Sequence, residues 1–66
     1  MIKSTTLCAA VSGGDSVTWL CCYDVENDRF YFEIKVVYEG IDKNSKYYLF
    51  TEAETAFRKY AKIVCS

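Results

Sequence analysis

The chain has 66 residues, of which 52% are hydrophobic, 17% aromatic and 26% charged, and its formal net charge at pH 7 is −1. It contains three glycines, no proline and no histidine, which excludes the disordered, collagen-like and low-complexity classes. The length leaves room for one small core and so excludes a multidomain enzyme, and without histidine no imidazole can serve as a base or a metal ligand.

The first half of the chain predicts two strands joined by a turn. Apolar residues alternate over residues 3–11, which indicates a first strand, and the glycines of 12–16 allow the positive φ angles of a turn. Residues 17–23 are rich in β-branched and aromatic side chains and are predicted as a second strand. Alternation places four residues on one face of this strand: Val17, Trp19, Cys21 and Tyr23.

The clearest strand pattern follows a predicted turn over residues 24–28 and covers residues 29–38. Apolar and polar residues alternate there, as is typical of an antiparallel strand with one covered face. The apolar face carries Phe30, Phe32, Ile34, Val36 and Tyr38. The opposite face carries Arg29, Tyr31, Glu33, Lys35 and Val37.

The last third of the chain predicts a polar loop over 39–45, a strand over 46–50 and an amphipathic helix over 52–63. We expect Thr51 to cap this helix and Glu54 to complete a capping box. An apolar stripe runs along the helix through Ala53, Ala56, Phe57, Tyr60 and Val64.

These elements predict one small α+β domain over residues 1–66, with an antiparallel meander of three to four strands and one C-terminal helix packed on one face (ββββα). A single helix covers one face only. The other face carries Tyr31, Val37 and one of Tyr47 and Tyr48. These side chains are either scattered surface residues or a surface for a partner or a second copy.

The four cysteines, Cys8, Cys21, Cys22 and Cys65, are expected to be reduced and mostly buried. The alternative is a disulfide from Cys8 to Cys21 or Cys22 across the first hairpin. Their spacing does not predict a metal site, and no cofactor is expected. We find no targeting segment or membrane span in the sequence, so the expected location is the cytosol of the producing or host cell.

Charge is distributed unevenly along the chain. Residues 15–42 hold seven carboxylates and two cations, whereas residues 43–66 hold five cations and two carboxylates. An acidic segment repels phosphate, so direct nucleic-acid binding is not expected, but such a segment can steer the protein toward a basic surface. The alternative is that the turn carboxylates are simply solvated.

The strand sequence RFYFEIKVVY (Arg29–Tyr38) and the strand-to-helix sequence KYYLFTEAETAFRKY (Lys46–Tyr60) lie in a short chain with an acidic middle and no catalytic constellation. In these respects the chain resembles the small anti-defence proteins of phages and mobile elements, including anti-CRISPR inhibitors. The resemblance implies a non-catalytic inhibitor whose target is a CRISPR effector nuclease or surveillance complex.

The leading hypothesis is therefore a protein-binding inhibitor with an acidic face that meets a basic, nucleic-acid-binding groove of its partner. Its predicted contact residues are the carboxylates Asp24, Glu26, Asp28, Glu33, Glu39 and Asp42 and the aromatic anchors Tyr31 and Tyr48. Two alternatives stay open: a self-associating structural or regulatory subunit that forms a homodimer, and a small nucleic-acid-binding domain. An enzyme and a membrane partner are not expected.

Overall fold

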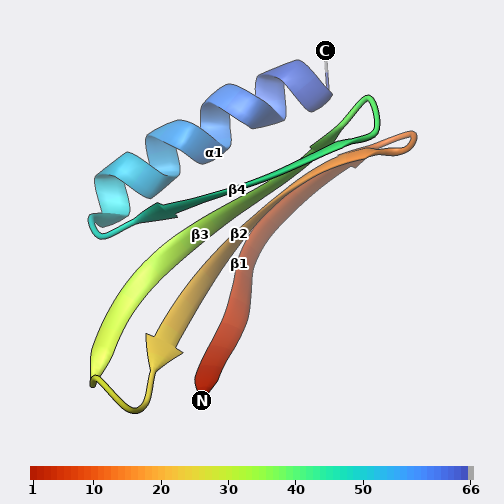
Figure 1. The fold of residues 1–66 in the computed structure, drawn as a ribbon. Helices are drawn as coiled ribbons and strands as arrows, with labels where there is room; N and C mark the ends of the chain where they lie inside the picture. The colour runs from red at the N-terminus through yellow and green to blue at the C-terminus, as the bar shows by residue number, and fades with distance from the viewer. Residues whose placement is uncertain (66) are drawn as a thin grey trace.

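The computed structural model describes residues 1–65. Its elements in chain order are β1 (Ile2–Ser12), β2 (Asp15–Asp24), β3 (Arg29–Tyr38), β4 (Ile41–Tyr47) and α1 (Phe50–Val64). The four strands form one sheet in the order β1-β2-β3-β4, and each neighbouring pair is antiparallel. Helix α1 lies along one face of this sheet (Figure 1). The predicted ββββα meander of the α+β class is confirmed.

The third hairpin is tighter than the sequence predicts. Instead of a loop over 39–45 and a strand over 46–50, a two-residue turn leads directly into β4 at Ile41. Glu39 and Gly40 have φ angles of 50° and 79°, and positive values at both positions are typical of a type I′ turn. The prediction placed the fourth strand too late in the chain, because β4 is mostly exposed and polar and has no clear apolar alternation.

Strand β1 contains a bulge. Thr6 lies opposite Leu20 and Cys8 lies opposite Trp19, so Leu7 is an extra residue without a partner on β2. The bulge breaks the alternation predicted over 3–11. After it, Cys8 and Ala10 lie on the helix side of the sheet, and Ala10 packs against the core.

The predicted capping box is wrong. Helix α1 begins at Phe50, with Leu49 as the N-cap residue and no side-chain capping hydrogen bond. The ring of Phe50 lies 5.0 Å from that of Trp19 and 5.8 Å from that of Phe32, between centroids. Packing of Phe50 therefore fixes the start of the helix one residue before Thr51. Glu54, the second member of the predicted box, pairs with Arg58 at 3.6 Å.

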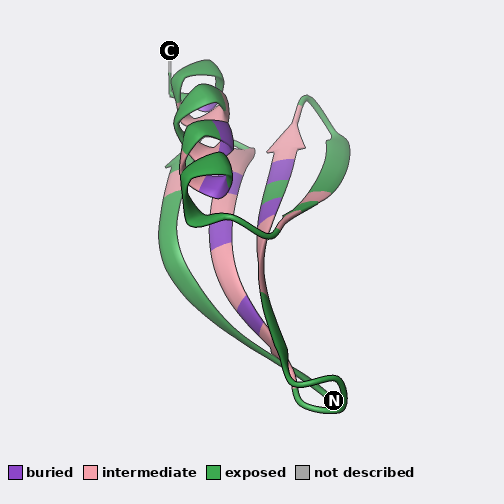
Figure 2. Cartoon of the chain, turned by 90° about the vertical axis from the view of Figure 1, so that its left-hand side faces the viewer, coloured by how far each residue is buried: buried purple, intermediate pink, exposed green. Residues whose placement is uncertain are grey.

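The core lies between α1 and the two central strands. Strand residues Val17, Trp19, Ile34 and Val36 are buried under the helix residues Ala53, Ala56 and Val64. Figure 2 shows the buried positions on the underside of the helix and along the central strands. The predicted apolar faces of the second and third strands and the helical stripe are thus confirmed where the helix lies over the sheet.

The helix covers only part of this face. Its 15 residues span about 22 Å, whereas the molecule is 38 Å long. Strands β2 and β3 run on beyond the start of the helix toward the turn that joins them (Figure 1). We call Val17, Trp19, Ile34 and Val36 the covered half of the sheet and residues 21–30 its uncovered end.

All four cysteines are free. Cys22 is buried and Cys21 is half-buried, but Cys8 and Cys65 are exposed, so the prediction of mostly buried cysteines is wrong for two of them. Cys8 lies opposite Trp19, and not opposite Cys21 or Cys22 as the alternative disulfide supposed. Over the described residues, no helix is long and apolar enough to cross a membrane.

Candidate interaction surfaces

The turn between β2 and β3 holds three of the predicted carboxylates. Asp24 stabilises the turn from within. The Asp24 carboxylate accepts hydrogen bonds from the backbone N–H groups of Glu26 (3.1 Å) and Asn27 (3.3 Å) and from Asn27 Nδ2 (2.7 Å). The Asn27 side chain is the main cause that lowers the pKa of Asp24 below its ordinary value of 3.8. Asp24 therefore shapes the turn, and its oxygens are already occupied.

Glu26 and Asp28 lie at the tip of the same turn and are exposed. Glu26 Oε1 is 3.1 Å from the N-terminal ammonium of Met1, and both groups are well solvated. Asp28 accepts a 2.6 Å hydrogen bond from the Tyr23 hydroxyl, which raises the pKa of that tyrosine. The two carboxylates thus remain accessible to a partner, and Asp28 also fixes an aromatic ring beside the turn.

An aromatic pair adjoins this acidic turn on the helix side of the sheet. The rings of Tyr23 and Phe30 are stacked, with centroids 4.5 Å apart, and Phe30 is 65% exposed. At the start of the helix, Leu49 and Phe50 are also exposed. Phe30 was predicted as a core residue from its alternation. Only the length of the helix relative to the strands could have shown that this position is left open.

On the opposite face, the predicted anchors Tyr31 and Tyr48 come together. Their ring centroids are 6.5 Å apart, Tyr48 is 69% exposed, and Lys46 Nζ lies 5.1 Å from the Tyr31 centroid. The rings take part in a shallow pocket of about 480 Å³ lined by Ile2, Asp24, Asn27, Arg29, Tyr31, Lys46 and Tyr48. Both tyrosines therefore lie next to the acidic turn, on the face of the sheet opposite the Tyr23–Phe30 pair.

This open face is not uniformly acidic. Glu33 lies opposite Lys46 in the β3–β4 register, and Asp24 lies opposite Arg29 across β2 and β3. Glu33 also accepts a 3.3 Å hydrogen bond from the Cys22 thiol. Its charges are balanced: Asp24, Glu33 and Asp42 against Arg29, Lys35 and Lys46. Neighbouring charges of opposite sign reduce the field that an acidic face needs for steering.

The remaining predicted residues, Glu39 and Asp42, lie at the other end of the strands. Glu39 belongs to the β3–β4 turn and its backbone N–H donates a 3.0 Å hydrogen bond to Asp15 Oδ1. Asp42 lies opposite Val37, one position further into β4. The structure therefore gathers Asp24, Glu26, Asp28, Tyr31 and Tyr48 near one end of the sheet, leaves Glu33 on the open face, and separates Glu39 and Asp42 from them.

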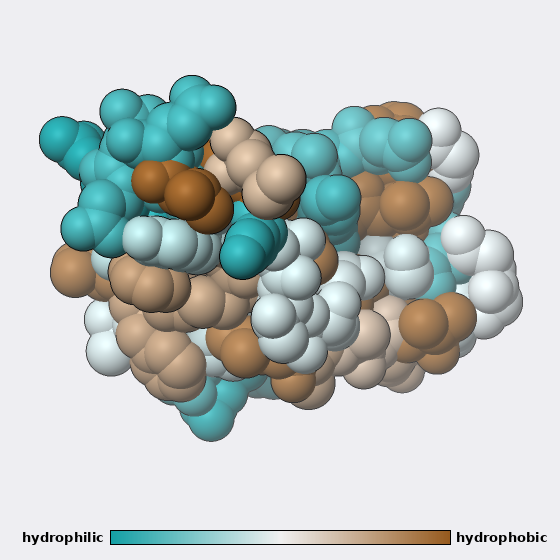
Figure 3. Space-filling model, turned by 90° about the horizontal axis from the view of Figure 1, so that it is seen from below, coloured by the Kyte–Doolittle hydropathy of each residue, from teal (hydrophilic) through white to brown (hydrophobic). Residues whose placement is uncertain are grey.

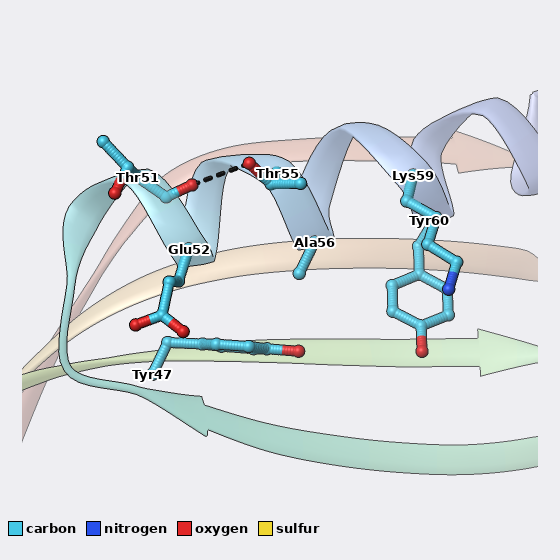
Figure 4. Close-up of a pocket in the computed structure, with 7 residues that line it drawn as sticks. All are labelled: Tyr47, Thr51, Glu52, Thr55, Ala56, Lys59 and Tyr60. Atoms are coloured by element: carbon cyan, nitrogen blue, oxygen red, sulfur yellow. Dashed lines mark hydrogen bonds between the residues drawn. The ribbon is translucent and has the colours of Figure 1, made fainter.

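A groove between α1 and β4 was not foreseen from the sequence. It has a volume of about 420 Å³ and is lined by Tyr47, Thr51, Glu52, Thr55, Ala56, Lys59 and Tyr60. Figure 4 shows the ring of Tyr47 below the first turns of the helix and the ring of Tyr60 pointing toward the sheet, with Ala56 between them. Lys43 Nζ is 3.4 Å from the Tyr60 hydroxyl, so this ring is tied to β4. None of these seven lining residues is a cysteine.

Within residues 1–65, no group of three or more potential ligands is placed to hold a metal ion. The open surfaces of this part of the chain instead combine aromatic rings with charged side chains. No family model, curated protein or solved structure matches the chain.

Proposed function

We propose that this chain is a non-catalytic protein-binding inhibitor that occupies a surface of a larger partner with the uncovered end of its sheet. The observation that carries the proposal is the exposed Phe30 ring, stacked on Tyr23 beside the acidic turn. Binding sites of proteins commonly place a few aromatic anchors within a polar rim. The uncovered end has both an exposed aromatic ring and exposed carboxylates around it.

The energetics of Phe30 support this role. Fully burying a phenylalanine side chain contributes about 1.5–3 kcal/mol, and 65% of this residue is still exposed in the isolated chain. The stacked geometry holds the ring in place, so little side-chain freedom is lost when a partner covers it. Phe30 is thus a prepared anchor, and Tyr31 and Tyr48 extend the contact around the other side of the same end.

The exposed carboxylates of Glu26 and Asp28 favour a partner with a basic surface. The resemblance to anti-CRISPR proteins gives this partner a concrete form, namely the nucleic-acid-binding groove of a CRISPR effector in the cytosol. In this proposal Glu26 and Asp28 meet lysine or arginine side chains that otherwise hold nucleic acid. Glu39 and Asp42 lie at the other end and are outside the contact.

A panel of purified CRISPR effectors, assayed for target cleavage and for binding of the chain at low and high salt, tests the proposal. We expect the wild-type chain to inhibit at least one effector. Phe30→Ser and the double variant Glu26→Lys/Asp28→Lys should weaken the inhibition at least tenfold. The charge-reversed variant should also lose most of the salt dependence.

The matched control is Ile41→Ser, which replaces a side chain of similar exposure (68%) in β4, away from the β2–β3 turn. It should inhibit as well as the wild type. Equal loss of inhibition in Ile41→Ser and Phe30→Ser, or full inhibition by both Phe30→Ser and the charge-reversed variant, contradicts the proposed contact.

A further inference from the structure

We propose that β1 pairs edge to edge with β1 of a second copy of this chain through residues 8–12, so that two four-stranded sheets join into one of eight strands. The contact uses the edge of the sheet opposite β4 and does not depend on the function proposed above. Three features favour this pairing: the difference between the two edge strands, the direction of the free backbone groups and the symmetry of the register.

The two edges of the sheet differ in how they are protected. Natural sheets guard their edges with charged side chains, short strands or a covering element, because free N–H and C=O groups invite pairing. β4 has seven residues, including Asp42, Lys43 and Lys46. β1 has eleven residues with Lys3 as its single charge, and ten of the eleven are exposed. β1 is therefore the less protected edge.

The surface around β1 has the same character. Its exposed apolar residues include Leu7 (47%) and Val11 (69%). Figure 3 views the molecule from below, where the start of β1 and the β2–β3 turn lie in Figure 1. Near-neutral and hydrophobic surface occupies much of the middle and lower part of this view, while strongly hydrophilic atoms lie mainly along its upper part, with a further group at the lower edge. Within β1 itself, Lys3 is the single charged side chain.

The first hairpin shows which backbone groups are free. Ser12 lies opposite Asp15 across a two-residue turn, and Gly13 has the positive φ angle (61°) of a type II′ turn. In such a hairpin the residues that flank the turn exchange hydrogen bonds with each other, and this pattern alternates along the strand. The N–H and C=O groups of Ala9 and Val11 therefore point away from β2, toward the open edge.

These groups are self-complementary in one antiparallel register. If Ala10 lies opposite Ala10 of the second copy, then Ala9 lies opposite Val11 and can exchange both hydrogen bonds with it, twice by symmetry. Ala9 and Val11 share the open face, so the side chains of each pair point to the same side. The opposed side chains are small, and Lys3 lies outside the paired segment.

The bulge at Leu7 sets the extent of the contact. It shifts the alternation of β1, so residues 2–6 cannot continue the ladder that residues 8–12 begin. Five paired residues on each copy form a small interface, well below the roughly 1,600 Å² that is typical of stable complexes. We therefore expect a dimer that dissociates on dilution.

Sedimentation from micromolar to millimolar concentration tests the dimer. We expect the wild type to move from monomer to dimer over this range. Val11→Lys should remain monomeric because it guards the edge, and Val11→Pro should do so because it removes an outward donor without loss of a β1–β2 hydrogen bond. The matched control Asn44→Lys, on the exposed edge strand β4, should dimerise like the wild type.

Cross-linking tests the register and does not depend on the substituted edge remaining foldable. In a Cys8→Ser/Cys65→Ser background, Ala10→Cys should form a disulfide-linked dimer under mild oxidation. The two copies of residue 10 form a pair without mutual hydrogen bonds, and in such antiparallel pairs the Cα atoms are about 4.5 Å apart. Asn44→Cys in the same background should stay monomeric.

A wild type that is monomeric at millimolar concentration overturns the proposal. So does a dimer that is unchanged in Val11→Lys, or cross-linking that is as fast at Asn44→Cys as at Ala10→Cys. None of these outcomes bears on inhibition by the uncovered end, which is measured on a partner protein.

Discussion

Phe30 and Ile34 lie on the same face of the same strand, yet Phe30 is 65% exposed and Ile34 is 1% exposed. Both belong to one regular alternation that is continuous from Phe30 to Tyr38. The difference comes from α1, whose 15 residues are too short to cover the whole length of β3. Alternation thus assigns a residue to a face, whereas the length of the covering element decides whether that face is core or surface.

The largest expected effect tests the covered half directly. Ile34→Ala should lower the free energy of unfolding by about 2–5 kcal/mol, because it opens a cavity in the core of a very small domain. Phe30→Ala removes a larger side chain but should cost less than about 1 kcal/mol, since most of this ring already contacts water. Urea unfolding followed by Trp19 fluorescence measures both. Equal losses would mean that the two ends of the face are not different.

The next effect concerns Cys22, which lies in the uncovered end but is buried on the opposite face. Burial, followed by the hydrogen bond to Glu33, raises the pKa of this thiol from 9.0 to about 11. The Cys22 thiol ionises at a lower pH in the unfolded chain than in the folded one. Its contribution to stability is therefore complete below pH 9 and is lost as the pH rises toward about 11.

Unfolding of the wild type and of Cys22→Ala at a series of pH values checks this. The difference in stability between the two proteins should narrow as the pH rises from 9 to 11. A difference between the wild type and Cys22→Ala that does not change with pH would show that Cys22 is open to solvent.

The smallest expected effect concerns the pKa of Asp24 in the acidic turn. Asp24 should titrate below its ordinary pKa of 3.8, with the Asn27 side chain as the main cause. Its contribution to stability is present above that value and is lost as the pH falls through the lowered pKa. Carboxyl NMR titration should show the pKa of Asp24 rising toward 3.8 in Asn27→Ala. An unchanged pKa would mean that the turn is not held by this pair.

Much of the fold follows from local patterns. The alternation in β2 and β3 and the stripe from Ala53 to Val64 predicted the faces that form the core, because both elements bury one side only. The start of α1 was not predicted, since Phe50 is held by Trp19 and Phe32, which are distant in sequence. The bulge at Leu7 and the polar strand β4 also depend on pairing with neighbouring strands and leave little local signal.

The candidate site was predicted in part. The sequence identified the acidic turn and the pair of Tyr31 and Tyr48, because turn carboxylates and outward-facing tyrosines are visible in the alternation. It could not show that Glu39 lies at the far end of the sheet or that Lys46 lies opposite Glu33. It also assigned Phe30 to the core, because nothing local encodes where the helix stops covering β3.

One measurement tests the central claim, that the covered half holds the fold and the uncovered end makes the contact. Phe30→Ser should keep an unfolding free energy within about 1 kcal/mol of the wild type and should lose inhibition of a responsive CRISPR effector by at least tenfold. A variant that inhibits normally, or one that loses inhibition only because it unfolds, would contradict this division of the sheet.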